Sequence, residues 1–119
     1  MDQDIESDKL KQSLSNKIFV EPATRRVRPY LVDYLRLLSA KAKKLHKNDL
    51  FGREGHSLAM DICGALVHQD AVGIQNDGWF NAKSEPVLYE LLAVSGALDA
   101  DTNQPEKWEQ LFELAERLK

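Results

Sequence analysis

Residues 24–47 read TRRVRPYLVDYLRLLSAKAKKLHK and carry the longest continuous helix signal in the chain. At about 100° per residue, apolar side chains gather on one side of such a helix and charged ones on the other. The predicted inner face consists of Leu31, Tyr34, Leu35, Leu38, Ala42 and Leu45. Pro29 suits the first turn, and Asn48 with Asp49 marks the end. The stretch therefore predicts an amphipathic helix with one face in a core and the other in water.

The same stretch concentrates the positive charge. It holds eight of the 16 arginines and lysines but a single acid, Asp33, in a chain of net charge −3. The rest of the chain is acidic, and such an asymmetry can steer an oppositely charged partner. Lysines in the last turns also complement the helix dipole, and charge runs are commonly solvated helix faces. A binding role and mutual neutralisation of basic and acidic faces therefore both stay open.

Size and composition indicate one globular domain. The chain has 119 residues, 43% hydrophobic and 29% charged, which is ordinary for a domain with its own core. The single cysteine, Cys63, cannot form an internal disulfide, which favours a reducing compartment. No apolar run reaches the length of a membrane span, and the opening MDQDIESD is acidic, unlike a signal peptide. We therefore expect a cytoplasmic protein that does not contact a membrane.

The segments before the long helix are less regular. Residues 1–16 are polar and predict a weak or frayed helix, set apart from a single helical domain over residues 17–119. Residues 18–20 predict a short strand or an extended plug, and residues 21–28 predict a linker that carries arginines. Further along, Ser57 is expected to cap a buried helix that runs to His68 and contains no arginine or lysine.

The second half of the chain predicts a turn region and two more helices. Residues 71–82 predict a small β-hairpin, because Asp77-Gly78 supplies the positive φ of a tight turn between two apolar runs. The next helix is expected to begin at Pro86 and end near Gly96, and the last to follow Pro105. The predicted fold class is mainly α, a compact single domain of four to five helices with one small β-hairpin.

No catalytic or metal-binding pattern stands out. Cys63 and His68 are five residues apart and point to different faces of one helix, so they do not make a nucleophile–base pair by themselves. The three histidines have neither the i, i+4 spacing of a helical zinc site nor a companion cysteine cluster. The chain also lacks a P-loop and a dinucleotide-binding glycine motif. We therefore expect a protein that is not an enzyme, with no metal and no cofactor.

The remaining hypothesis is that the basic residues and the aromatic residues near them bind another macromolecule, since arginine and aromatic side chains are typical of interface centres. The candidate binding residues are Arg25, Arg26, Arg28, Tyr30, Arg36, Lys43, Lys44, Lys47 and Trp79. For Trp79, packing in the core is the competing interpretation. We expect a small adaptor, inhibitor or regulatory subunit that binds a protein partner with an acidic surface. The alternatives are phosphate contacts to nucleic acid through the same residues, and a homodimer that joins a basic face to an acidic one.

Overall fold

The computed structural model describes residues 2–20 and 24–119, and the side chains of residues 7–20, 24–72 and 77–119. Over these ranges the chain forms six α-helices, one short 3₁₀ turn and no strand. The elements are α1 (Asp2–Phe19), η1 (Arg25–Val27), α2 (Arg28–Lys43), α3 (Lys47–Leu50), α4 (Arg53–Asn76), α5 (Pro86–Ala100) and α6 (Pro105–Glu116). None of the described helices combines the length and the apolar character needed to cross a bilayer.

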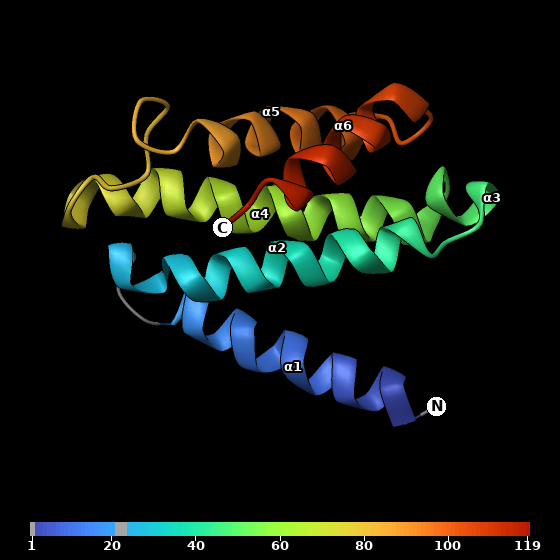
Figure 1. The fold of residues 1–119 in the computed structure, drawn as a ribbon, viewed down its shortest axis with the longest axis horizontal. Coiled ribbons are helices and arrows are strands. Elements are labelled where there is room, and N and C mark those ends of the chain that lie inside the picture. The colour runs from blue at the N-terminus through green and yellow to red at the C-terminus, as the bar shows by residue number, and fades with distance from the viewer. Residues whose placement is uncertain (1, 21–23) are drawn as a thin grey trace.

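The long helix α4 lies between two helix pairs (Figure 1). α1 and α2 lie on one side of it and α5 and α6 on the other, while α6 also packs against α2. α1 approaches α2 near the C-terminal end of α1 and diverges from it toward the N-terminus (Figure 1). The radius of gyration is 13.8 Å, close to the roughly 13.5 Å expected for a compact domain of this length. The chain is thus a compact, mainly helical single domain.

α2 has the predicted amphipathic character. Its buried residues are Leu31, Val32, Tyr34, Leu35, Leu38, Ser39 and Ala42, and Leu45 is partly buried just beyond the helix. Each fully buried leucine contributes about 1.5–3 kcal/mol relative to an exposed one. This face therefore fixes α2 against α1, α4 and α6. The helix ends at Lys43, earlier than expected, and a short turn leads into α3 at Lys47.

The predicted hairpin over residues 71–82 is wrong. α4 continues through Asn76, so the apolar residues before the turn belong to a helix. Asp77 does make a turn, since its Oδ1 accepts a hydrogen bond of 3.2 Å from the Trp79 backbone N–H, and Gly78 has a φ of 63°. Trp79 and Phe80 are buried, and their rings meet edge to face at 5.5 Å. Packing of these rings against the helices replaces strand pairing, and the core interpretation of Trp79 is confirmed.

Other predicted boundaries also differ. The strand or plug at residues 18–20 is wrong, because α1 runs through Phe19 and buries Ile18, whose carbonyl accepts a hydrogen bond from the Gln69 amide. α4 begins at Arg53, four residues before the expected cap. α5 continues past Gly96, where a Cβ would lie 3.9 Å from the Cys63 sulfur. This glycine therefore lies at the α4–α5 contact and does not end a helix. Residues 21–23 of the expected linker lie outside the described residues.

Arg28 joins the beginning of α2 to the loop before α5 and to the segment after α6. Its Nε donates to Glu85 Oε1 at 2.7 Å, and the Glu85 side chain is only 8% exposed. Its Nη1 donates to the backbone carbonyl of Lys119 at 2.6 Å. Leaving a buried carboxylate without its partner is costly. Arg28 is therefore part of what holds the fold together.

Replacing Arg28 should accordingly destabilise the protein. We expect Arg28→Met to lower the free energy of unfolding by about 2–3 kcal/mol, because Glu85 loses its cation. The matched control is Arg26→Met, which removes an exposed arginine and should change the value by less than about 0.5 kcal/mol. Urea unfolding measures both variants, and equal losses would contradict the structural role of Arg28.

Two glycines of α4 should respond in opposite ways to replacement by alanine. A Cβ at Gly55 would overlap the backbone of Leu50, whereas a Cβ at Gly64 would meet no atom within 4 Å. We expect Gly55→Ala to destabilise the fold by about 3 kcal/mol and Gly64→Ala to stabilise it by about 1 kcal/mol, the helix propensity difference. Thermal unfolding at low protein concentration compares them, and a tolerated Gly55→Ala would contradict the close α3–α4 contact.

Candidate functional site

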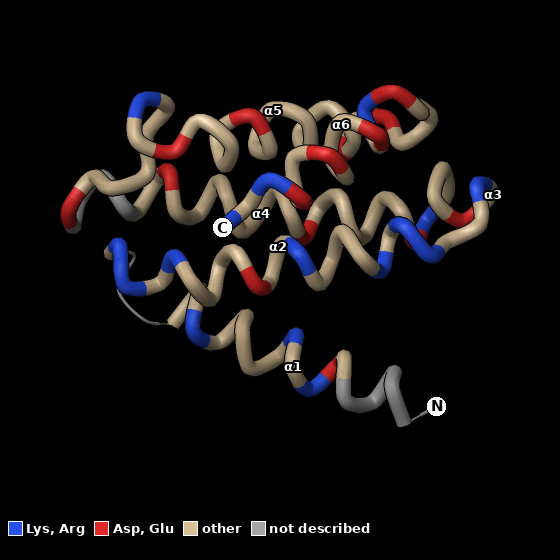
Figure 2. Tube along the Cα trace, in the orientation of Figure 1, with Lys and Arg blue, Asp and Glu red and all other residues tan. Residues whose placement is uncertain are grey.

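The predicted binding residues do not form one continuous surface. Figure 2 shows Lys and Arg positions before α2, near its middle and at its C-terminal end. Arg25 and Arg26 precede the helix, Lys44 and Lys47 follow it, and its 16 residues place the two ends about 24 Å apart. Trp79 is 6% exposed and lies in the core. The sequence thus identified the cations, but it could not show that they are spread along α2 and beyond both of its ends.

Carboxylates of the same chain neutralise part of this charge. Lys41 Nζ lies 3.4 Å from Asp8, and Lys43 Nζ lies 3.3 Å from Glu116. Exposed pairs of this kind contribute about 0–1 kcal/mol, so a partner can replace them easily. The acidic side chains of residues 2–6 lie outside the described ones. Within the part of the chain that the structure describes, no ion pair involves Arg25, Arg26, Arg36, Lys44 or Lys47.

Tyr30 lies near the N-terminal end of α2 and is 37% exposed. The Lys17 ammonium lies 5.7 Å from the centre of its ring, within the range of a cation–π contact between α1 and α2. This contact gives Tyr30 a structural role at the junction of the two helices. One face of the Tyr30 ring, which was expected to bind a partner together with the arginines, is therefore already covered by Lys17.

Four exposed cations from the C-terminal half of α2 onward form a basic ridge, which we define as Arg36, Lys43, Lys44 and Lys47. One groove beside it faces α6, has a volume of about 200 Å³ and includes Arg36, Lys43 and Phe112 in its lining. A second groove faces α1 and α4, has a volume of about 600 Å³ and includes Lys44, Leu45 and Leu58. Each groove therefore combines cations with apolar lining.

The groove toward α6 contains an aromatic side chain beside its cations. Phe112 is partly buried and stacks on the fully buried Trp108, with 6.0 Å between the ring centres. Arg36 offers a planar guanidinium that can bind a carboxylate through two parallel hydrogen bonds. Lys43 adds a second positive charge on the same wall. This arrangement suits a carboxylate that is followed by an apolar side chain.

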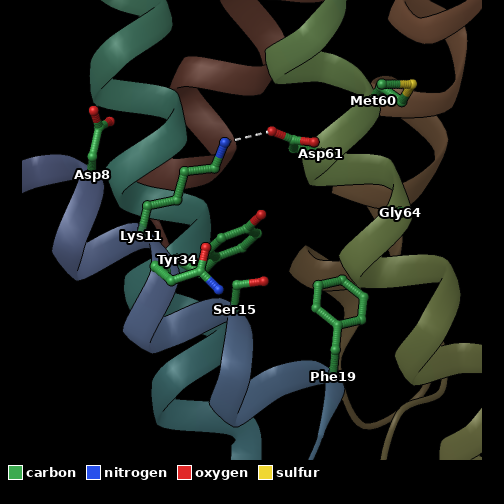
Figure 3. A pocket seen from close by; sticks show the side chains of 9 residues that line it. Asp8, Lys11, Ser15, Phe19, Tyr34, Met60, Asp61 and Gly64 are labelled. Atoms are coloured by element: carbon green, nitrogen blue, oxygen red, sulfur yellow. Dashed lines mark hydrogen bonds and ion pairs between the residues drawn. The ribbon is translucent and has the colours of Figure 1, made fainter.

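A third hollow, of about 470 Å³, lies between α1, α2 and α4 (Figure 3). Lys11 reaches across it to Asp61, with 2.7 Å between Nζ and Oδ2. The hydroxyls of Ser15 and Tyr34 point into the hollow, and Phe19 lies at one end (Figure 3). Lys11 and Asp61 pair with each other, and the third charged group of the lining, Asp8, pairs with Lys41 outside it. Through the described residues that line it, the hollow therefore offers hydrogen bonds and no cation that is free for an acidic ligand.

Tyr34, which lines this hollow, and Cys63, which faces α5, both have a raised pKa. Burial, with a smaller contribution from the Asp61 carboxylate, raises the pKa of Tyr34 to about 12. Burial also raises the pKa of the Cys63 thiol, although a hydrogen bond with Ser95 opposes the change. A protonated phenol and a protonated thiol are weak nucleophiles at neutral pH. Among the side chains that the structure describes, no group of three His, Cys, Asp or Glu residues is placed to hold a metal ion.

Comparison of the chain with protein-family models, with curated proteins and with solved structures gives no match. The geometry and charge of the grooves therefore carry the functional argument.

Sequence reasoning missed the apolar lining of the grooves. Phe112, the aromatic residue of the groove toward α6, was not among the candidate binding residues, and it is only partly buried. The signal was its position, because it follows Leu111 directly and so lies about 100° around the helix from that fully buried residue. Residues at the edge of an apolar stripe are the ones that line grooves between helices.

The Tyr34 phenol should ionise at a higher pH than an exposed tyrosine, because its pKa is raised. Its folded pKa is raised above the unfolded value, so this residue favours the folded state fully below pH 10 and loses that contribution as pH rises toward 12. We expect the absorbance titration of tyrosinate in wild-type protein to contain a component near pH 12 that is absent from Tyr34→Phe. If the component that Tyr34→Phe lacks is instead centred near pH 10, Tyr34 is not shielded from water.

Proposed function

We propose that this chain is a non-catalytic binding protein, a small adaptor, inhibitor or regulatory subunit, whose basic ridge binds an acidic segment of a protein partner. One observation carries the proposal, namely the groove between α2 and α6, where Arg36 and Lys43 stand beside Phe112. Because its lone cysteine, Cys63, is free, we place this role in the reducing cytoplasm.

The charges of the groove are available to a partner at low cost. No ion pair involves Arg36 among the described side chains. The Lys43 and Glu116 side chains are 62% and 71% exposed, so their mutual attraction is screened by water. A partner carboxylate can therefore take the place of Glu116 without leaving a buried charge unpaired. A hydrogen bond to a charged group contributes about 1.5–3 kcal/mol when it is made in place of water.

Burial of Phe112 would add an apolar contribution to this polar recognition. The ring is held by its contact with Trp108, so it need not lose much conformational freedom on binding. Aromatic side chains next to arginine are typical of the residues that dominate protein interfaces. The groove therefore fits a short segment in which an acidic residue neighbours an apolar one.

The same geometry favours a protein partner over nucleic acid. A phosphate backbone requires cations that follow it continuously. Here Glu116 lines the groove toward α6, and Asp8 and Glu54 line the groove toward α1 and α4. These carboxylates divide the cations into short patches, which match the separate carboxylates of a peptide better than a continuous phosphate backbone. Arg25 and Arg26 lie beyond the opposite end of α2 from Lys43, so the cations do not form one continuous track.

A matched pair of charge-reversal variants tests the proposal. We expect the triple variant Arg36→Glu, Lys43→Glu, Lys47→Glu to fold normally and to lose partner capture in pull-downs that are quantified by mass spectrometry. The control reverses three exposed cations away from the ridge, Lys9→Glu, Lys83→Glu and Arg117→Glu, and should capture the same proteins as wild type. Equal capture by both variants would exclude the ridge as the binding surface.

The nucleic-acid alternative is tested with the same variants. Fluorescence anisotropy with random duplex and single-stranded oligonucleotides across a salt series would reveal phosphate contacts as a steep loss of affinity with salt. We expect the wild-type protein to bind these oligonucleotides no more tightly than the control variant does. Tight, salt-sensitive binding that only the ridge variant loses would reassign the ridge to nucleic acid.

A further inference from the structure

The outer face of α4, at the edge of the hollow beside α1, carries an exposed apolar stripe, which we define as Met60, Gly64, Val67 and Ala71. Met60 and Gly64 also line that hollow (Figure 3). Met60 and Val67 are each 49% exposed, and Gly64 and Ala71 are also exposed. Successive members are four, three and four residues apart, which is the spacing of the contact positions between two packed helices. The stripe contains no charged residue, so a partner helix could cover it without burying an unpaired charge.

Internal packing gives no reason for a glycine in the middle of this stripe. A Cβ at Gly64 would meet nothing within 4 Å, in contrast to Gly55, where the backbone of Leu50 leaves no room. A glycine inside a helix costs about 1 kcal/mol relative to alanine. Its use here is explained if another backbone approaches α4 closely from outside.

The layers on either side of the stripe carry opposite charge. Residues 1–47, which include α1 and α2, contain eleven arginines and lysines and six acids. Residues 77–119, which include α5 and α6, contain four and nine. α4 lies between these two layers (Figure 2). The molecule is therefore an electric dipole that points across α4, roughly at right angles to the helix axis.

This charge asymmetry determines which orientation of a second copy is favoured. When two copies face each other across a two-fold axis parallel to α4, the basic layer of one lies against the acidic layer of the other. A two-fold axis perpendicular to α4 within the interface would place like layers together and repel them. The first arrangement is closed and isologous, so it joins two copies and does not grow further.

We infer that the outer face of α4 binds a second copy of this chain, with the two α4 helices parallel and in register. The two Arg53 side chains would then lie on the same side of the dimer, but they are exposed at the helix end, where salt screens them. The stripe is about 17 Å long, which is short for a standard interface of about 800 Å² per partner. We therefore expect a reversible dimer at high protein concentration. The basic ridge is not part of this stripe, so loss of one contact leaves the other in place.

Sedimentation equilibrium over a wide concentration range tests the dimer. Wild-type protein should show a concentration-dependent rise toward twice the monomer mass, and Gly64→Arg should remain a monomer with unchanged circular dichroism. The control Ala40→Arg changes a small exposed residue of α2 to the same side chain and should still dimerise. A wild-type protein that stays monomeric throughout, or a Gly64→Arg variant that dimerises as well as wild type, would overturn the inference.

Cross-linking tests the orientation and remains decisive if Gly64→Arg fails to fold. In a Cys63→Ala background, Met60→Cys should form a disulfide-linked dimer with itself on mild oxidation, because both introduced thiols lie at the same level of the parallel pair. Antiparallel helices would instead bring the Met60 position of one copy near the Val67 position of the other. Cross-linking confined to mixtures of Met60→Cys and Val67→Cys, or the absence of any cross-link, would overturn the parallel arrangement.

Discussion

Burial of one face of α2 is the constraint on which the rest of the structure depends. Leu31, Leu35 and Leu38 are at most 1% exposed, and they fix the rotation of the helix about its own axis. Once that rotation is set, residues on the opposite arc must face water. The apolar face thus determines where the charges point, and the charges contribute little to holding the helix in place. Arg28 is the exception, because its ion pair with Glu85 joins α2 to the loop before α5.

Some of the cations pair with carboxylates of the same chain, and others remain available to a partner. Lys41 and Lys43 have carboxylate partners within the chain, although both pairs are long and the carboxylate of each is exposed. Arg36 and Lys44 are among the cations for which the described side chains offer no such partner. Internal neutralisation is therefore partial. What remains is a short cationic surface with a groove on each side that combines charged and apolar lining, which is a more selective feature than a uniformly basic face.

Sequence reasoning succeeded where one physical effect dominated. The inner face of α2 was predictable because its leucines recur with the helical period and no other element competes for them. The region around residues 71–82 was not, since Asp77-Gly78 makes a turn in either context. The deciding factor was the burial of Trp79 and Phe80 against distant helices, a tertiary effect that a local pattern does not contain. For the same reason, the candidate site was predictable in its cations but not in its groove, which needs α6 beside α2.

The most direct test of this account asks whether the ridge cations help to hold the fold together. Urea unfolding of a variant that carries Arg36→Gln, Lys43→Gln, Lys44→Gln and Lys47→Gln would answer it, with Leu35→Ala as the reference for lost packing. The account predicts a change of less than about 1 kcal/mol for the quadruple variant and a loss of about 2–5 kcal/mol for Leu35→Ala. A loss of several kcal/mol in the quadruple variant would mean that the chain uses these charges internally, and the ridge would no longer be free for a partner.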